Sequence, residues 1–204
     1  MPIVTFRRIV RRARYGKAIV IVSGLPRSGT SMMMQMLEAG GMEILTDGIR
    51  TPDESNPHGY YELERVKALE TSEDRAWLRD ARGRVVKIIA FLVQYLPETF
   101  NYKVVFMHRN LDEVLASQAK MLAQRGQTSD TDDARMRELF VDHLTRSKSM
   151  LSYRSCFEVL DVRYAHVLDN ALEQAALVNR FLGGRLDTDG MAAVVNAKLY
   201  RNRR

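Results

Sequence analysis

The sequence predicts an α/β protein, a three-layer sandwich with a central parallel sheet. Two observations lead to this fold class. Short apolar runs rich in β-branched residues alternate with amphipathic stretches of helical length, and a glycine-rich turn joins the first apolar run to a helix. Strands buried on both faces appear as continuous apolar runs, and the helices between them cover the two faces of the sheet. We expect a single domain over residues 1–204, because the polar stretch at 126–131 is too short to divide the chain.

The first third of the chain holds the most regular pattern. A continuous apolar run over 17–23 predicts a buried strand, and the glycine-rich segment 24–29 predicts the turn that follows it. The apolar residues of 30–39 predict a helix, which a pair of glycines ends. Prolines, glycines and polar residues then predict a loop over 46–59, and a helix is expected over 60–69.

The rest of the chain repeats the alternation of strand and helix. Apolar runs at 84–89, 102–107 and 157–162 predict three further strands. Apolar residues three and four positions apart predict the helices that separate and follow them. These helices are expected at 111–124, 132–152, 171–182 and 188–195.

Composition excludes several classes of protein. The apolar runs fall far short of the roughly 18 residues that a membrane span needs. A single cysteine, Cys156, excludes an internal disulfide framework and a cysteine-based zinc cluster. We therefore expect a protein of the reducing cytoplasm. The sequence also shows no metal-binding motif, and no metal site is expected.

The net charge of +6 is concentrated at one end of the chain. Residues 1–17 contain five arginines, one lysine and no acid, which accounts for the whole net charge. Phe6, Ile9, Val10 and Ala13 recur at helical spacing, so this basic extension can form a short amphipathic helix. One interpretation is a weak contact with an anionic membrane surface or a nucleic acid, and the other is a solvated helix or a frayed end. No specific nucleic-acid partner is expected.

The most specific motif is Val22-Ser-Gly-Leu-Pro-Arg-Ser-Gly-Thr-Ser31, which joins a strand to a helix. Its glycines let successive N–H groups point into one concavity, and the helix adds its free N–H groups and positive dipole end. This arrangement predicts a site for an anion, most simply a phosphate. The glycines have the spacing of a Walker loop, but Thr30 occupies the lysine position, which argues against transfer of a γ-phosphoryl group. Arg27 is the cation of this loop.

A second motif supplies another cation and hydroxyl. Arg109 stands at the carboxyl end of the third predicted strand, and Ser117 follows about two helical turns later. Because ligands bind at the carboxyl edge of such sheets, this pair predicts a second anion site. Asp112 and Glu113 lie between them, and we interpret these acids as a complement to the helix dipole after an N-cap at Asn110.

Together the two motifs resemble those of the sulfotransferase superfamily, which has a P-loop NTPase-like fold and uses 3′-phosphoadenosine 5′-phosphosulfate (PAPS) as its donor. The resemblance spans residues 18–184 and is closest to the bacterial and protein-tyrosine branches. It implies that the first motif binds the 5′-phosphosulfate, that the second binds the 3′-phosphate, and that a tyrosine near the fourth strand lies by the adenine. The implied donor-binding residues are Pro26, Arg27, Ser28, Gly29, Thr30, Ser31, Arg109, Ser117 and Tyr164.

The chain departs from the cytosolic small-molecule branch of this superfamily. Lys87 matches a lysine of that branch, but the position of its catalytic histidine is Ile89, so a histidine base is excluded there. Met32 stands where that branch has a tryptophan that stacks on the adenine. The C-terminal loop that contacts the 3′-phosphate in that branch is missing. Its candidate replacements are Lys198, Arg201 and Arg203.

The resemblance also implies where the catalytic groups lie. Arg27 and Lys87 are the expected cations that hold charge on the transferring group. In the protein-tyrosine and heparan branches the base is a glutamate just beyond the first helix of the motif. The matching candidates here are Asp53, Glu54, His58 and Glu62. His108 is a further candidate, although a histidine at a strand end is more often packed than catalytic.

The resulting hypothesis is a PAPS-dependent sulfotransferase that acts on a hydroxyl or amine acceptor. Two alternatives remain open on the same fold: a P-loop nucleotide kinase or NTPase, and a non-catalytic module that binds a nucleotide or a protein. The acceptor can be a small molecule, a carbohydrate, a lipid or a protein tyrosine, because the fold does not determine it.

Overall fold

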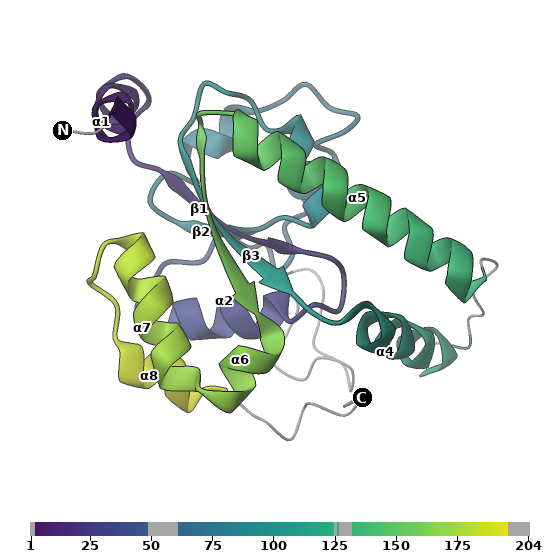
Figure 1. Cartoon of the computed structure of the whole chain (residues 1–204). Helices are drawn as coiled ribbons and strands as arrows, with labels where there is room; N and C mark the ends of the chain where they lie inside the picture. Colours follow the sequence, from purple (N-terminus) through teal and green to yellow (C-terminus); the bar gives the residue numbers. More distant parts are fainter. Residues whose placement is uncertain (1–2, 49–60, 125, 127–131, 196–204) are drawn as a thin grey trace.

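Four parallel strands form the central layer of the protein (Figure 1). The computed structural model describes residues 3–48, 61–124, 126 and 132–195. Within this part of the chain the strand order is β2-β1-β3-β4, and every neighbouring pair is parallel. All four strands lie where apolar runs predicted them. They are β1 (Ile19–Gly24), β2 (Val85–Lys87), β3 (Tyr102–His108) and β4 (Phe157–Arg163).

Helices cover both faces of this sheet, which confirms the predicted three-layer sandwich (Figure 1). One outer layer holds α2 (Thr30–Ala39), α6 (Tyr164–Asp169), α7 (Ala171–Leu182) and α8 (Thr188–Ala193). The other holds α3 (Glu64–Lys67), α5 (Asp133–Tyr153) and two 3-10 turns, η1 (Ala76–Arg79) and η2 (Ala90–Tyr95). Helix α4 (Leu111–Gln124) continues from β3 and packs against α5, and α1 (Ile3–Tyr15) precedes β1.

The central strand β1 shows how the sequence builds two cores. Ile19 and Ile21 pack into the cluster that includes η1, η2 and α5 residues, whereas Val20 and Val22 pack into the cluster with α2, α7 and α8. Successive side chains of a strand point to opposite faces, so a run of β-branched residues fills both cores at once. The resulting rigid strand ends at Gly24, at the carboxyl edge where the site is built.

The helix predicted over 60–69 is wrong in extent, because α3 covers four residues only. Tyr61 has a φ angle of 51°, which a right-handed helix does not accommodate. The main-chain oxygen of Glu62 instead accepts a hydrogen bond from Thr46 Oγ1 at 2.7 Å. Neither η1 nor η2 is predicted by the sequence pattern, because 3-10 segments of four and six residues are too short to show a period.

Among the helices of the described ranges, none is both long and apolar enough to cross a bilayer.

Candidate functional site

The glycine loop, residues 24–29, joins β1 to α2 at the carboxyl edge of the sheet. Gly24 has a φ angle of 146°, and a Cβ there would lie 2.6 Å from the main-chain oxygen of Met107 on β3, so only glycine fits. Ser28 tightens the loop, since its N and Oγ donate at 3.2 and 2.7 Å to the main-chain oxygen three residues earlier. Arg27 has a φ angle of 68°, a conformation that few non-glycine residues adopt.

Gly29 begins α2 in contact with the ring of Tyr164. Its φ angle is 93°, and a Cβ there would lie 2.4 Å from Cδ2 of that ring. Gly29 is the N-cap residue of α2 and has no side chain to cap the first N–H groups of the helix. The first turn also carries no acidic residue. The N-terminus of α2 therefore has a positive dipole end without a side-chain cap, which is a suitable place for an anion.

Arg109 lies just beyond β3, where it contacts Glu113, Arg27 and Tyr164. Its Nε donates to Glu113 Oε2 at 2.9 Å, and its Nη1 donates to the main-chain oxygen of Arg27 at 3.0 Å. Its guanidinium carbon lies 4.6 Å from the centre of the Tyr164 ring, a cation–π geometry. The side chains of Arg109 and Glu113 are only 8% and 5% exposed, so this ion pair is buried. Burial raises the pKa of the Tyr164 hydroxyl, although the nearby Arg109 charge lowers it in part.

The side chain of Arg27 connects the glycine loop to α4. Its Nε donates to Oγ of Ser117 at 3.0 Å, and Ser117 is buried. The main chain of the same residue accepts the bond from Arg109. One residue of the loop therefore contacts both members of the second motif. The structure thus brings together the residues that the sequence assigned to two separate anion sites.

Strand β2 contributes a third cation. Lys87, at the end of β2, pairs in register with Val22 of β1. Its Nζ donates to Oγ of Ser31, in the first turn of α2, at 3.2 Å. Thr30 stands where a Walker loop has its lysine, so here the lysine that reaches the helix N-terminus comes from the neighbouring strand.

The structure describes only some of the residues that are candidates for the catalytic base. Six of the residues considered above lie outside the described residues: Asp53, Glu54, His58, Lys198, Arg201 and Arg203. Glu62 is described, with its side chain 22% exposed and its Oε2 3.5 Å from Nζ of Lys67. His108 is half-buried, and its Nε2 lies within hydrogen-bond distance of Oδ1 of the exposed Asp161 on β4.

The sequence pattern did not reveal the part that Glu113 takes. The predicted N-cap is confirmed, because Asn110 Oδ1 accepts from the main-chain N of Asp112 at 2.8 Å. Beyond complementing the helix dipole, however, Glu113 orients Arg109, and Asp112 forms an ion pair with Arg137 of α5. The spacing of four residues between Arg109 and Glu113 is the signal that could have indicated the pair.

The arrangement suits a ligand with more than one anionic group. Arg27, Lys87 and Arg109 converge on the N-terminus of α2, where they can hold negative charge on a bound or reacting group. Among the residues that the structure describes, no group of three or more His, Cys, Asp or Glu side chains could hold a metal ion.

Comparisons with known proteins agree with this fold. Sulfotransferase STF1 from Mycobacterium tuberculosis H37Rv is 17% identical, with a TM-score of 0.55 over 97% of this chain and 82% of that one. The sulfotransferase domain from the curacin biosynthetic pathway is 13% identical, with a TM-score of 0.51 over 88% and 83%. Mouse sulfotransferase SULT7A1, solved in complex with PAP, is 18% identical, with a TM-score of 0.51 over 90% and 64%. At these identities the likeness is one of fold alone.

Sequence comparison supplies the assignment to a family. Among curated proteins none matches the chain significantly. The family described as "Sulfotransferase domain" matches residues 17–203, nearly the whole chain. The match includes the glycine loop, Lys87, the Arg109 motif and Tyr164. The chain therefore belongs to the sulfotransferase family, which places its activity in sulfotransfer.

Proposed function

We propose that this protein transfers a sulfonate group from PAPS to a hydroxyl or amine of an acceptor. The observation that carries the proposal is the junction at Arg27, which joins the glycine loop to Ser117 and Arg109. PAPS carries anionic groups at the 5′ and 3′ positions of its ribose. The glycine loop is expected to bind the first of these, and the motif of Arg109 and Ser117 the second. The mouse sulfotransferase of similar fold, solved with PAP, supports the same class of donor.

The glycine loop and the first turn of α2 are the proposed site of the 5′-phosphosulfate. Main-chain N–H groups at a helix N-terminus bind phosphate-like oxygens well, and Arg27 and Lys87 add positive charge beside them. The proposed residues are Pro26, Arg27, Ser28, Gly29, Thr30 and Ser31. Arg109 and Ser117 are the proposed ligands of the 3′-phosphate, and Tyr164, which already supports both motifs, is the residue proposed nearest the adenine.

The proposed reaction is an in-line displacement at sulfur. The acceptor oxygen or nitrogen forms a bond to sulfur while the bond from sulfur to the bridging phosphate oxygen breaks, which leaves the sulfated acceptor and adenosine 3′,5′-bisphosphate. Arg27 and Lys87 stabilise the charge that develops on the leaving oxygen. A base takes the proton of the acceptor, and Glu62, Glu54 and His58 are the residues proposed for that task.

Calorimetric titration with nucleotides tests this proposal. We expect adenosine 3′,5′-bisphosphate to bind more tightly than ADP or ATP with magnesium. Arg109→Ala and Ser117→Ala should weaken this binding by roughly tenfold to a hundredfold each, since each removes a hydrogen bond to a charged group. Arg146→Ala and Ser149→Ala, two exposed positions of α5, are the matched controls and should leave it unchanged.

The other outcomes separate the competing functions. Preference for ATP with magnesium would contradict the sulfotransferase proposal and favour a nucleotide kinase. Binding of none of the three nucleotides would favour a non-catalytic module. If the bisphosphate binds as expected, transfer of labelled sulfonate from PAPS to acceptors of the four candidate classes identifies the substrate.

A further inference from the structure

Helix α1 stands beside the three layers rather than within them (Figure 1). It is attached through its last turns, where Arg11 donates to the main-chain oxygens of Glu98 and Phe100 at 2.7 and 2.9 Å. Asn101 returns a bond from its Nδ2 to the main-chain oxygen of Arg11 at 3.1 Å. These contacts attach the C-terminal half of α1 to the segment that precedes β3.

The described part of α1 exposes apolar and basic side chains together. Ile9 and Val10 are 56% and 47% exposed, and Ala13, one turn further on, is exposed as well. Arg12 and Arg14 are also exposed, and the helix contains no acidic residue. Adjacent exposed branched residues on a helix with charge of one sign are typical of helices that lie in the interface of a membrane.

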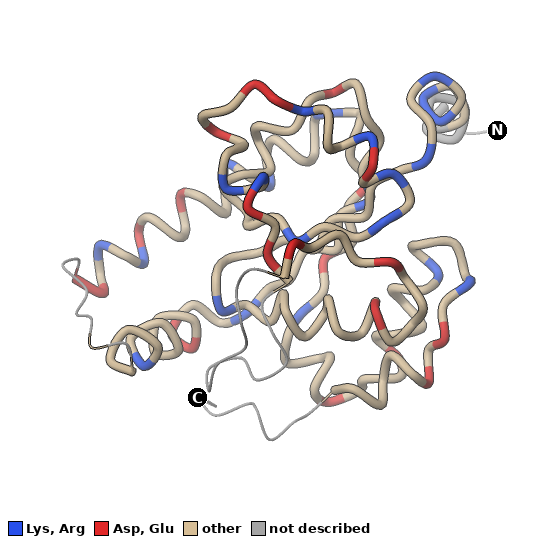
Figure 2. The backbone as a smooth tube through the Cα atoms, turned by 180° about the vertical axis from the view of Figure 1, so that it is seen from behind, with Lys and Arg blue, Asp and Glu red and all other residues tan. Residues whose placement is uncertain are grey.

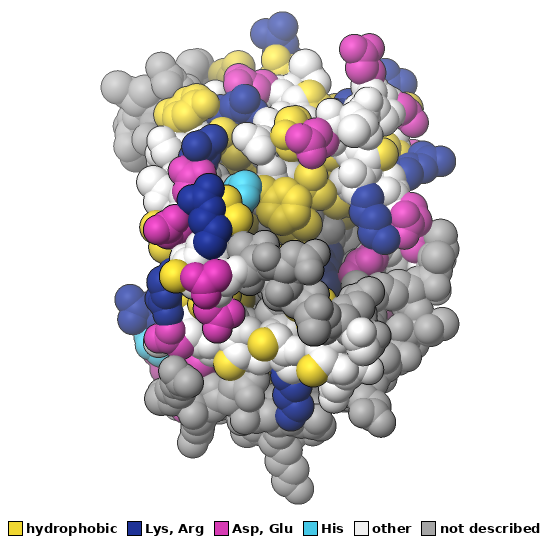
Figure 3. All heavy atoms as spheres, turned by 90° about the vertical axis from the view of Figure 1, so that its right-hand side faces the viewer, with side chains coloured by type: hydrophobic (Ala, Val, Ile, Leu, Met, Phe, Trp, Pro, Cys, Tyr) yellow, Lys and Arg dark blue, Asp and Glu magenta, His cyan; other side chains and the backbone are white. Residues whose placement is uncertain are grey.

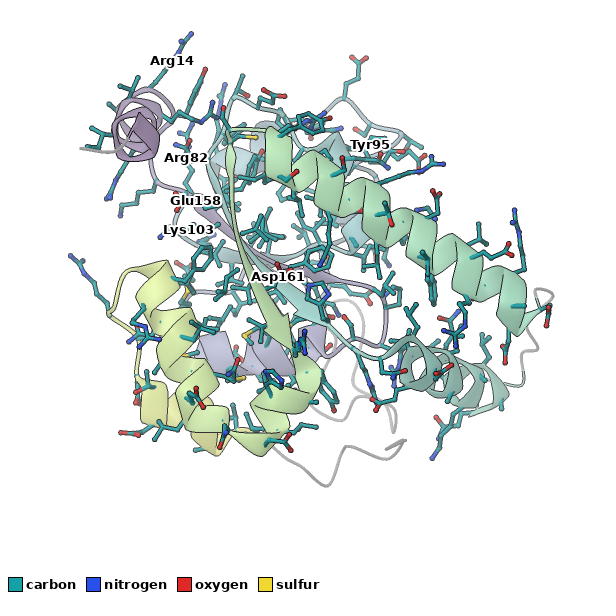
Figure 4. The ribbon with its side chains drawn as sticks, viewed as in Figure 1. Arg14, Arg82, Tyr95, Lys103, Glu158 and Asp161 are labelled. Carbon is teal, nitrogen blue, oxygen red and sulfur yellow. The ribbon has the colours of Figure 1, made fainter. Side chains whose placement is uncertain are left out.

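A second segment adds basic side chains next to those of α1. Arg82, from the turn before β2, lies beside the link between α1 and β1, within 3.6 Å of where a Cβ of Gly16 would stand. Figure 4 labels Arg82 next to α1, which carries Arg14. In Figure 2 the described part of α1 shows Lys and Arg positions and no Asp or Glu. Lys17, at the same end of the sheet, is exposed too.

The surface of α5 is a useful contrast. Figure 3 shows that the side of the molecule formed by α4 and α5 mixes basic and acidic side chains. Exposed arginines of α5 form ion pairs within the helix, Arg135 with Glu138 and Arg146 with Asp142. Charges of one sign next to exposed branched residues are therefore a property of the α1 end, not of the surface in general.

We propose that α1 docks the protein on an anionic lipid bilayer, with Ile9 and Val10 inserted between headgroups and Arg12, Arg14, Lys17 and Arg82 against their negative charge. A short helix needs both the burial of apolar side chains and the attraction between opposite charges to bind stably to a membrane surface. The apolar residues favour a bilayer over a nucleic acid, because binding to a phosphate backbone rests on the charges alone.

The location of α1 makes this contact independent of the donor site. The helix leads into the amino end of β1, whereas the glycine loop follows its carboxyl end. A strand of six residues spans about 20 Å, so the site would face away from the bilayer. Lipid binding and nucleotide binding can thus be tested separately. If the protein fails to bind lipid, the proposed nucleotide site is unaffected, and the reverse also holds.

Vesicle flotation of the full chain tests the proposal. We expect binding to vesicles of phosphatidylcholine with phosphatidylserine, weakened by added salt, and little binding to phosphatidylcholine alone. Arg12→Glu with Arg14→Glu should lower the partition coefficient by about tenfold or more. Ile9→Asn with Val10→Asn should do the same without a change of charge.

Leu172→Asn is the matched control, because Leu172 is 52% exposed on α7. It should bind vesicles like the unaltered protein, and all variants should bind adenosine 3′,5′-bisphosphate equally. Absence of binding to the anionic vesicles would overturn the proposal. So would full vesicle binding by the Ile9→Asn, Val10→Asn variant, or binding to a DNA duplex in preference to the vesicles, because charge alone would then account for the surface.

Discussion

The two helices that follow β1 and β3 begin in opposite ways. Helix α2 begins at Gly29, with no capping side chain and no acid in its first turn. Helix α4 begins after Asn110, whose side chain caps it, and has Asp112 and Glu113 in its first turn. Both helix N-termini lie at the same edge of the sheet, yet of the two only α2 has neither a side-chain cap nor an acid to offset its positive end.

This difference shows how the site divides its tasks. At the α4 end, the Asn110 side chain accepts from the N–H of Asp112, and Glu113 holds Arg109, so the positive charge there is carried by a side chain. The α2 end presents main-chain N–H groups and gives up the stability that a cap would add. Substitutions at the two helix ends and at Arg109 test this division.

Arg109→Ala should have the largest effect on stability. It leaves the Glu113 carboxylate, 5% exposed, without its buried partner, which costs about 3–5 kcal/mol. Chemical denaturation measures this free energy of unfolding. The control is Arg137→Ala, which removes the partner of the half-exposed Asp112 and should cost at most about 1 kcal/mol. If the two variants lose the same free energy of unfolding, the buried pair of Arg109 and Glu113 contributes no more to stability than the exposed pair does.

Gly29→Ala should destabilise the protein by about 2–4 kcal/mol. The new Cβ would meet the Tyr164 ring at 2.4 Å, and the φ angle of 93° is strained for alanine. Gly41→Ala is the control, because Gly41 has a φ angle of 90° and a Cβ added there would have nothing within 4 Å. It isolates the backbone cost, about 1 kcal/mol. Thermal unfolding that gives the two variants the same stability would contradict close contact between the loop and Tyr164.

Ser31→Asp should separate binding from stability. An acid in the first turn of α2 complements the dipole, so the free energy of unfolding should stay constant or rise by up to about 1 kcal/mol. Binding of adenosine 3′,5′-bisphosphate should nevertheless fall by roughly a hundredfold, because the carboxylate repels the ligand and engages Lys87. Ser31→Asn changes the size without the charge, and it should retain most of the binding. Unchanged binding by the Asp variant would place the anion elsewhere.

Asn110→Ala should give the smallest effect. Loss of the cap on α4 costs about 1 kcal/mol of stability. Nucleotide affinity should remain within about twofold, because Glu113 still holds Arg109. A large loss of affinity in calorimetry would show that the α4 N-terminus itself binds the ligand, and the division between the two helices would fail.

Much of this molecule follows from local patterns in the sequence. Continuous apolar runs located all four strands, and the glycine spacing with Arg27 located the loop before α2. Helix 60–69 was predicted too long because periodicity encodes neither the left-handed conformation of Tyr61 nor the tertiary contact between Thr46 and Glu62. The buried pairing of Arg109 with Glu113 was missed because an acid early in a helix already had a local explanation.

The central claim is that the glycine loop and the motif of Arg109 and Ser117 bind the same nucleotide. Measuring how much the 3′-phosphate adds to the affinity tests this claim. Calorimetry of adenosine 5′-phosphate and adenosine 3′,5′-bisphosphate measures it as a ratio of two dissociation constants. We expect the bisphosphate to bind at least about tenfold more tightly, and this ratio to fall by about tenfold in Ser117→Ala while the affinity for the 5′-phosphate changes little. The same ratio in both proteins would contradict a role for Ser117 and its α4 neighbours in binding the donor.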